Sequence, residues 1–292
     1  LFAFVGLLAV ALVSCKGGGV KQDPILRLSA EEALTQGKEL MERGKFVQST
    51  QYLDHAFEVA PNSATGREAL LLAADAYFLA GGTSNFVKAE SKYRDFLNRF
   101  PTSDRSDYVQ MQIAQCLAEQ MLRPDRDQTA TLKALTAFEG VLQLYPTSGY
   151  AEEVQAKIVE IRQDLAEHEY RVGRYNYRRR LYTAAAWRLE GITEDFPDFH
   201  EMDKVLYMLG MAFGRGGRPE MAIEVFDRLT NEYPDSRYLK KLPDVEKFKR
   251  NVKGKQGKKT QETAKTDETD ESEETDESEE PDKNEKKEKT QP

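Results

Sequence analysis

The chain has 292 residues, and its 42 lysines and arginines against 50 aspartates and glutamates give a formal net charge of −8. Hydrophobic residues make up 39% and the mean hydropathy is −0.66, so we expect part of the chain to lie outside any core. The acidity is concentrated at one end, because residues 251–292 hold 9 basic and 14 acidic residues. The remainder is close to neutral, and this balance does not favour a broadly basic nucleic-acid-binding protein.

The chain starts with an apolar run over residues 1–13 that stops at Ser14. A helix needs about 20 apolar residues to cross a bilayer, so the run is too short to span a membrane. It has the length of a signal-peptide core, although a basic segment and an initiating Met are missing. We therefore expect residues 1–14 to be a signal peptide that is incomplete at its N-terminus.

The residues that follow the run indicate a lipid anchor. Leu12-Val13-Ser14-Cys15 resembles the bacterial lipobox, in which the cysteine is acylated and becomes the new N-terminus. We expect lipidation at Cys15 and a flexible tether over residues 15–28, which begins with Lys16 and three glycines. Lys16 in place of Asp favours the outer membrane. The alternative is an ordinary signal peptide with an incidental cysteine.

The middle of the chain repeats one pattern, an aromatic or apolar residue followed by Pro at the end of a helical stretch. The intervals between successive prolines are 40, 45, 51 and 37 residues, for Pro61, Pro101, Pro146, Pro197 and Pro234. Periods of this size indicate stacked helical units, and no run alternates as a strand does. We predict an all-α fold over residues 29–250, with five TPR-like helix-turn-helix repeats in a right-handed solenoid.

The last unit fits the tetratricopeptide (TPR) pattern best. Gly210, Ala222, Phe226 and Pro234 fall at its offsets, where small residues let paired helices approach and Pro ends the second helix. Gly214–Gly217 resembles a phosphate loop only superficially and is expected to be the turn of this unit. Residues 123–128 are expected to be a loop, and residues 150–170 an extra long helix that joins the third and fourth units.

Residues of catalytic chemistry are scarce. The three histidines, His55, His168 and His200, have no companion at ligand spacing, and Cys116 lies in an apolar helical stretch. Hydrolase, zinc-protease and Walker motifs are missing. We expect no enzyme activity, no cofactor and no metal site.

The stretch from Tyr170 to Arg188 stands out, because it interleaves arginines and tyrosines and contains the only Trp of the chain. These residue types are enriched where proteins bind one another. The candidate partner-binding residues are Tyr177, Arg178, Arg179, Arg180, Trp187 and Arg188. The alternative is that the tyrosines pack within TPR units and the arginines are solvated.

The last segment, residues 251–292, has no aromatic residue and is dominated by Thr, Asp, Glu, Ser and Lys. It cannot bury enough apolar area to offset the entropy lost on ordering, so we predict a disordered charged tail. A solvated tail without a partner and a docking arm are both open interpretations of it.

Three sequence motifs together resemble the BamD family, the TPR lipoproteins of the outer-membrane β-barrel assembly (BAM) machinery. The resemblance covers about residues 15–240 and is carried by residues 107–111 (DYVQM), by residues 125–127 (DRD), and by residues 165–198, which include LAEHEY, WRLEGI and DFPD. The third motif is the most specific. The acidic tail departs from the family.

The resemblance implies a non-catalytic periplasmic scaffold, anchored by a lipid at Cys15 in the inner leaflet of the outer membrane. Its implied partners are the POTRA-containing barrel-forming subunit, other assembly lipoproteins and unfolded outer-membrane proteins, with no nucleic acid. Arg188 matches the arginine of the R-x-E-G motif and is the implied POTRA contact. The alternative is an envelope TPR lipoprotein that binds peptidoglycan or the cell-division or DNA-uptake machinery.

Overall fold

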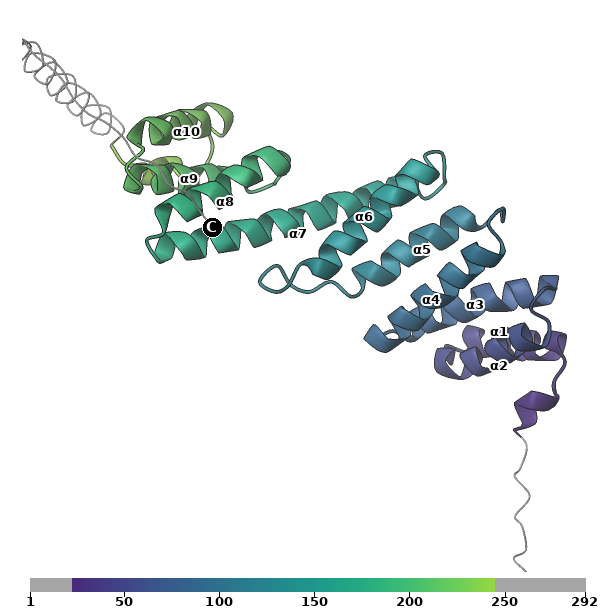
Figure 1. Ribbon diagram of the computed structural model, residues 1–292. Helices are drawn as coiled ribbons and strands as arrows, with labels where there is room; N and C mark the ends of the chain where they lie inside the picture. Colours follow the sequence, from purple (N-terminus) through teal and green to yellow (C-terminus); the bar gives the residue numbers. More distant parts are fainter. Residues whose placement is uncertain (1–22, 245–292) are drawn as a thin grey trace, which may run out of the picture. The chain divides into compact units, whose positions relative to one another are not determined.

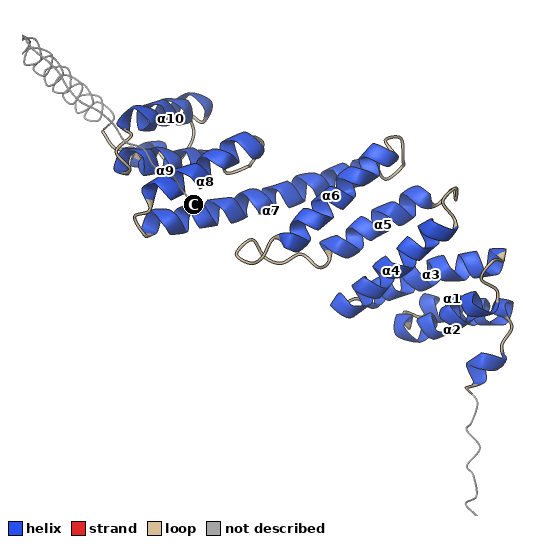
Figure 2. Cartoon of the chain, viewed as in Figure 1, coloured by secondary structure: helices blue, strands red, loops and turns tan. Residues whose placement is uncertain are grey.

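The computed structural model describes residues 23–244. Within this range the chain folds into ten α-helices and two short 3-10 helices, with no strand, which confirms the predicted all-α class (Figures 1 and 2). The chain divides between Leu165 and Ala166 into two compact units. We call the described residues before this division unit 1 and those after it unit 2.

The helices follow one another with short connections, as TPR hairpins require. In unit 1 they are α1 (Ala30–Glu42), α2 (Phe46–Val59), α3 (Ala64–Ala80), α4 (Thr83–Arg99), α5 (Ser106–Ala118) and α6 (Thr129–Leu144). Helix α7 (Ala151–Arg178) contains the division, and unit 2 continues with α8 (Tyr182–Asp195), α9 (Met202–Arg215) and α10 (Pro219–Glu232). The short helices are η1 (Pro24–Arg27) and η2 (Leu239–Lys241).

The repeated prolines end their helices by one common device. A residue directly before proline is excluded from helical backbone angles by the proline ring. The caps that precede the five prolines adopt nearly the same conformation, with φ between −138° and −128° and ψ between 57° and 62°, at Ala60, Phe100, Tyr145, Phe196 and Tyr233. The predicted helix ends are confirmed.

Glycines allow the paired helices to approach. A Cβ on Gly210 would lie 2.4 Å from the ring of Phe226, and one on Gly37 would lie 2.6 Å from Leu53. The predicted turn in the last hairpin is confirmed, because Gly217 has φ +81° between α9 and α10. Small residues at these positions therefore serve close packing and chain reversal.

The polar residues that follow two of the prolines hold the loops to the preceding helical pair. The Ser148 hydroxyl donates to Asp107 Oδ2 at 2.6 Å, and the Ser236 hydroxyl donates to Asp203 Oδ2 at 2.7 Å. Asp107 lies in the first turn of α5 and Asp203 in the first turn of α9. The same bond thus recurs in unit 1 and in unit 2.

The core of unit 1 is rich in alanine and contains a polar cluster. Asp75 Oδ1 accepts hydrogen bonds from the hydroxyls of Tyr93 (2.6 Å) and Tyr108 (2.9 Å), which come from α4 and α5. The Tyr93 side chain is fully buried. Cys116 is buried, as predicted, and burial raises its thiol pKa to about 12.

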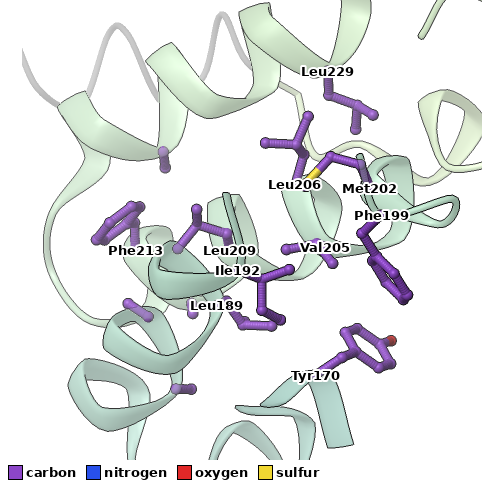
Figure 3. Packing of buried hydrophobic residues seen from close by; sticks show 14 of the residues in the cluster. Tyr170, Leu189, Ile192, Phe199, Met202, Val205, Leu206, Leu209, Phe213 and Leu229 are labelled. Atoms are coloured by element: carbon purple, nitrogen blue, oxygen red, sulfur yellow. The ribbon is translucent and has the colours of Figure 1, made fainter. Parts of the chain in front are cut away.

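The core of unit 2 is built from larger side chains of α8, α9 and α10, among them Leu189, Leu206 and Leu229 (Figure 3). Lys204 is buried beside it. Its ammonium lies 4.2 Å from the ring centre of Tyr170, forms an ion pair with Glu167 at 3.0 Å, and pairs closely with Glu201. Two carboxylates and a ring face thus compensate the buried charge.

Helix α7 differs from the helix expected over residues 150–170. The expected helix is an extra element between the third and fourth units. Helix α7 instead runs on to Arg178 and is itself the first helix of the fourth hairpin. Gly173 lies in α7 against Leu189 of α8, so the two helices pair closely. The helical spacing of apolar residues is confirmed, since Val154, Ile158 and Ile161 are buried.

Other expectations stay as predictions. The signal peptide, the lipidated Cys15 and the disordered tail fall outside the described residues. The count of five repeats and the right-handed sense of the solenoid also stay predictions. The expected loop at residues 123–128 is confirmed, because α5 ends at Ala118 and α6 begins at Thr129.

Candidate partner-binding surface

The turn between α7 and α8 exposes three of the candidate residues. Arg178 is the last residue of α7, and Arg179 and Arg180 follow it. The turn is closed by the backbone N–H of Leu181, which donates to the Asn176 carbonyl at 3.0 Å. Arg180 has φ +64°, the only positive φ of a non-glycine residue in the described part of the chain. The three side chains therefore project into solvent from a tight turn.

Trp187 and Arg188 lie together on α8. Trp187 is 67% exposed, which is unusual for so large an apolar side chain, and the Arg188 guanidinium lies 4.9 Å from its ring centre. Arg188 Nη1 donates to both carboxylate oxygens of Glu169 in α7, at 3.0 and 3.3 Å. These contacts fix the guanidinium beside an exposed aromatic ring.

Tyr177 differs from the other candidates because its ring packs against the core of unit 2. Its ring meets that of Tyr182 edge-on at 5.5 Å, and the Arg215 guanidinium lies 5.5 Å from its centre. Burial raises the pKa of its hydroxyl. The Tyr177 ring therefore packs within unit 2, as the alternative interpretation of the tyrosines expects.

Two hollows of about 500 Å³ each adjoin on this surface and share Thr183 and Ala184. The first is also lined by Ala186, Trp187, Glu190, Phe213 and Arg218. The second is also lined by Arg180, Leu181, Tyr182, Arg215 and Gly216. Apolar walls with guanidinium groups at the rim suit a protein segment that offers an apolar side chain flanked by carboxylates.

Unit 1 carries a larger hollow of about 1250 Å³ over α4, α5 and α6. Leu122 and Leu132, which line it, are 53% and 54% exposed. Its rim is polar, with Glu90, Arg94 and Asp127 among its residues. An extended chain with alternating apolar side chains fits such a groove.

Two features of unit 2 were not predicted from the sequence. They are the ion pair of Arg188 with Glu169 and the ion pairs of Lys204. Glu169 lies 19 residues from Arg188, and Glu167 lies 37 residues from Lys204. The Glu167 pKa is lowered, because hydrogen bonds from Lys204 and Arg171 outweigh the desolvation that would raise it. Only the pairing of α7 with later helices brings Glu169 to Arg188 and Glu167 to Lys204, whereas Glu201 lies three residues before Lys204.

Residues 23–244 contain neither a metal-binding cluster nor a helix that could span a membrane. No group of three or more His, Cys, Asp or Glu side chains there is placed to hold a metal ion. His55 is buried, and its Nε2 lies 3.1 Å from the Leu28 carbonyl oxygen. Of the helices described, none is long and apolar enough to cross a membrane.

A family model and several named relatives match this chain. The profile of the YfiO family, described as outer membrane lipoprotein, matches residues 27–222. A relative from Pasteurella multocida, named outer membrane protein assembly factor BamD, is 26% identical over 76% of this chain and 86% of its own length. Proteins of the same name from Caulobacter vibrioides and Neisseria meningitidis serogroup A are 25% and 24% identical, each over 80% of this chain and over 75% and 91% of their own lengths.

Solved TPR structures are also similar. The TPR domain of P58(IPK) aligns with 71% of this chain and 52% of its own, at 15% identity and a TM-score of 0.39. The TPR2AB domain of yeast Sti1 aligns with 71% of this chain and 78% of its own, at 12% identity and the same TM-score.

Proposed function

Because the chain belongs to the YfiO family of outer membrane lipoproteins, we propose that it is a non-catalytic scaffold for the assembly of β-barrel proteins in the outer membrane. The relatives named outer membrane protein assembly factor BamD support this role. The observation that carries the proposal is the Trp187–Arg188 pair, an exposed aromatic ring beside a guanidinium held by Glu169. Such a surface suits protein binding and offers no catalytic group.

The partner proposed for this surface is the POTRA-containing barrel-forming subunit. Trp187 would enter an apolar recess of the partner, while Arg188 would bind a partner carboxylate in addition to Glu169 or in exchange for it. A guanidinium presents two parallel N–H groups to a carboxylate, which a lysine cannot copy. Arg178, Arg179 and Arg180 would add longer-range attraction for an acidic surface and raise the association rate.

Unit 1 is proposed to meet unfolded outer-membrane proteins and other assembly lipoproteins. The hollow over α4, α5 and α6, with the exposed Leu122 and Leu132, suits the alternating apolar side chains of an unfolded strand. Lipidation of Cys15 is proposed to hold the protein at the periplasmic face of the outer membrane. No nucleic acid or cofactor is needed for this role.

The test is Arg188→Ala in the full chain, measured by capture of the barrel-forming subunit from detergent-solubilised envelopes. We expect capture to fall at least about tenfold, the usual cost of losing a well-placed interface arginine. Arg228→Ala is a matched control, because its side chain is 42% exposed against 39% for Arg188 and also pairs with one glutamate. We expect the control to bind as the unaltered chain does.

Two further measurements accompany the capture test. Circular dichroism should show unchanged helix content in Arg188→Ala, and Arg188→Lys should keep the charge but not restore capture. Full capture by Arg188→Ala at raised salt would overturn the proposed contact. Recovery of peptidoglycan or cell-division proteins without any barrel subunit would instead favour an envelope lipoprotein of another kind.

A further inference from the structure

The arginines of unit 2 are distributed unevenly with respect to acidic groups. From Tyr170 to Arg188 the sequence contains six arginines and no Asp or Glu. In the part of the chain that the structure describes, ion pairs form at Arg171 and Arg188 but at none of Arg178, Arg179 and Arg180. Three adjacent guanidinium groups at one turn therefore lack an anion.

The neighbouring hollows extend this positive surface. Arg180 and Arg215 line one hollow and Arg218 lines the other, where Glu190 is the single carboxylate among the lining residues. Arg215 is engaged with the Tyr177 ring rather than with an acidic group. We call Arg178, Arg179, Arg180, Arg215 and Arg218 the arginine surface. Like charges gathered in this way repel one another unless an anion covers them.

Three exposed arginines of unit 1 differ from those at the α7–α8 turn. Arg43, Arg94 and Arg99 each pair with a carboxylate four residues earlier in the chain, at distances of 2.8 to 3.3 Å. These side chains are 45% to 64% exposed and yet have a local anion. The three arginines at the α7–α8 turn have no such carboxylate four residues earlier in the chain.

The chain itself carries a complementary segment. Residues 267–282 contain eleven Asp and Glu and no Lys or Arg. They follow Asp244, the last described residue, by 23 positions, a length of chain that can reach about 75 Å when extended. Unit 2 up to Asp244 has 79 residues, and a folded body of that size has a radius of gyration of about 12 Å. The acidic segment can therefore reach any point on unit 2.

We propose that residues 267–282 bind the arginine surface of the same chain as an acidic cover. Single exposed ion pairs are weak, but many pairs on a tethered segment act together at a high effective concentration. The segment offers carboxylates but no aromatic or aliphatic side chain for the hollow beside Trp187. A protein partner with both carboxylates and an apolar anchor would therefore displace it.

The only tryptophan of the chain provides the test, since Trp187 lines the hollow that Arg218 also lines. The full chain is prepared with Cys15→Ser and Thr275→Cys, and a dansyl group is attached to the engineered thiol. Cys116 is buried and its thiol pKa is raised to about 12, so it stays unlabelled at neutral pH. Energy transfer from Trp187 to dansyl reports how close the acidic segment lies to the surface.

We expect strong transfer in low salt and its loss in 1 M salt, where the screening length falls to about 3 Å. The triple change Arg178→Gln, Arg179→Gln and Arg180→Gln should lower the ratio of bound to free segment about tenfold, since each exposed pair contributes a factor of about two. The matched triple change in unit 1, Arg43→Gln, Arg94→Gln and Arg99→Gln, should leave transfer unchanged.

Two results would overturn the proposal. Transfer that is equal in the unit 2 triple variant and the unaltered chain would show that the arginines do not hold the segment. Transfer that falls on tenfold dilution would show that the segment binds a second copy instead. The experiment contains no barrel subunit, so its failure leaves the proposed function untouched, and a failed Arg188→Ala capture test leaves the cover untouched.

Discussion

Units 1 and 2 each hold a charged group beside the helical core, and this charge has opposite signs in the two units. Unit 1 places the Asp75 carboxylate between two neutral hydroxyls, those of Tyr93 and Tyr108. Unit 2 places the Lys204 ammonium between two carboxylates, those of Glu167 and Glu201, and against the Tyr170 ring. Similar hairpins can thus carry either kind of polar core, and the two units should respond differently to mutation and pH.

The largest expected effect is that of Asp75→Ala in unit 1. The substitution leaves the Tyr93 hydroxyl without its acceptor, and the Tyr93 side chain is 0% exposed. A buried donor without an acceptor costs about 1–3 kcal/mol, and Tyr108 adds part of a second such cost, so we expect a loss of about 2–3 kcal/mol in urea unfolding. Asp95→Ala, which removes an exposed ion pair with Arg99 in the same unit, is the control and should cost less than about 0.5 kcal/mol.

Helix approach gives a second, smaller contrast between the units. Gly210→Ala in unit 2 pushes a methyl group to within 2.4 Å of the Phe226 ring, a rigid and fully buried group, and should cost about 2 kcal/mol. Gly37→Ala in unit 1 meets Cδ2 and Cγ of the buried Leu53 at 2.6 and 2.7 Å, and because an aliphatic side chain yields more easily than a ring, it should cost less, about 1 kcal/mol.

Gly140→Ala in α6 is the reference for both glycine changes, because nothing lies within 4 Å of its added Cβ. Without a clash the better helix propensity of Ala should stabilise the chain by up to about 1 kcal/mol. Thermal unfolding followed by circular dichroism measures all three variants. Equal losses at Gly37 and Gly210 would contradict the difference argued between a leucine and a phenylalanine neighbour.

The smallest expected effect is on pH dependence, and its sign differs between the units. Desolvation raises the Asp75 pKa above its ordinary 3.8, against the hydrogen bonds from Tyr93 and Tyr108 and the charge of Arg105. The folded state then holds its proton more tightly than the unfolded state, so the contribution of Asp75 to stability is lost as pH rises above about 3.8. The lowered Glu167 pKa acts the other way, and its contribution is lost as pH falls below 4.5.

Paired variants isolate these two groups. The unfolding free energy of the unaltered chain minus that of Asp75→Asn should fall as pH rises above 3.8 and level off once the raised pKa of the folded state is passed. The same difference taken against Glu167→Gln should fall as pH is lowered below 4.5. Urea unfolding at a series of pH values measures both, and two slopes of the same sign would refute the contrast.

Local sequence patterns predicted what local physics controls. The five prolines located five helix ends, because the proline ring disfavours helical angles at the residue before it through purely local contacts. Gly210 and Phe226 predicted a close pair, because they occupy fixed offsets within one hairpin. The separate helix expected over residues 150–170 is wrong, because the apolar period of α7 continues through the arginine-rich stretch to Arg178 without a break signal.

Long-range partners could not be predicted in the same way. Asp75 and Tyr108 are 33 residues apart, and Arg188 meets Glu169 only because α8 folds back on α7. Many carboxylates of the chain were equally plausible partners for Arg188 by sequence alone. Burial of Tyr177 was likewise undecided, since a tyrosine in an arginine-rich helix suits both a surface and a packed face.

The pre-proline caps also bear on how such a chain changes length during evolution. The two longest intervals between prolines have their extra residues in different places. Those between Pro101 and Pro146 lie in the loop between α5 and α6, and those between Pro146 and Pro197 lie in the 28-residue helix α7. The caps on either side of these insertions, Tyr145 and Phe196, keep the same backbone angles as the others. Each helix end depends on two adjacent residues, the proline and the residue before it. Residues can therefore be inserted elsewhere in a hairpin without moving the end of its second helix.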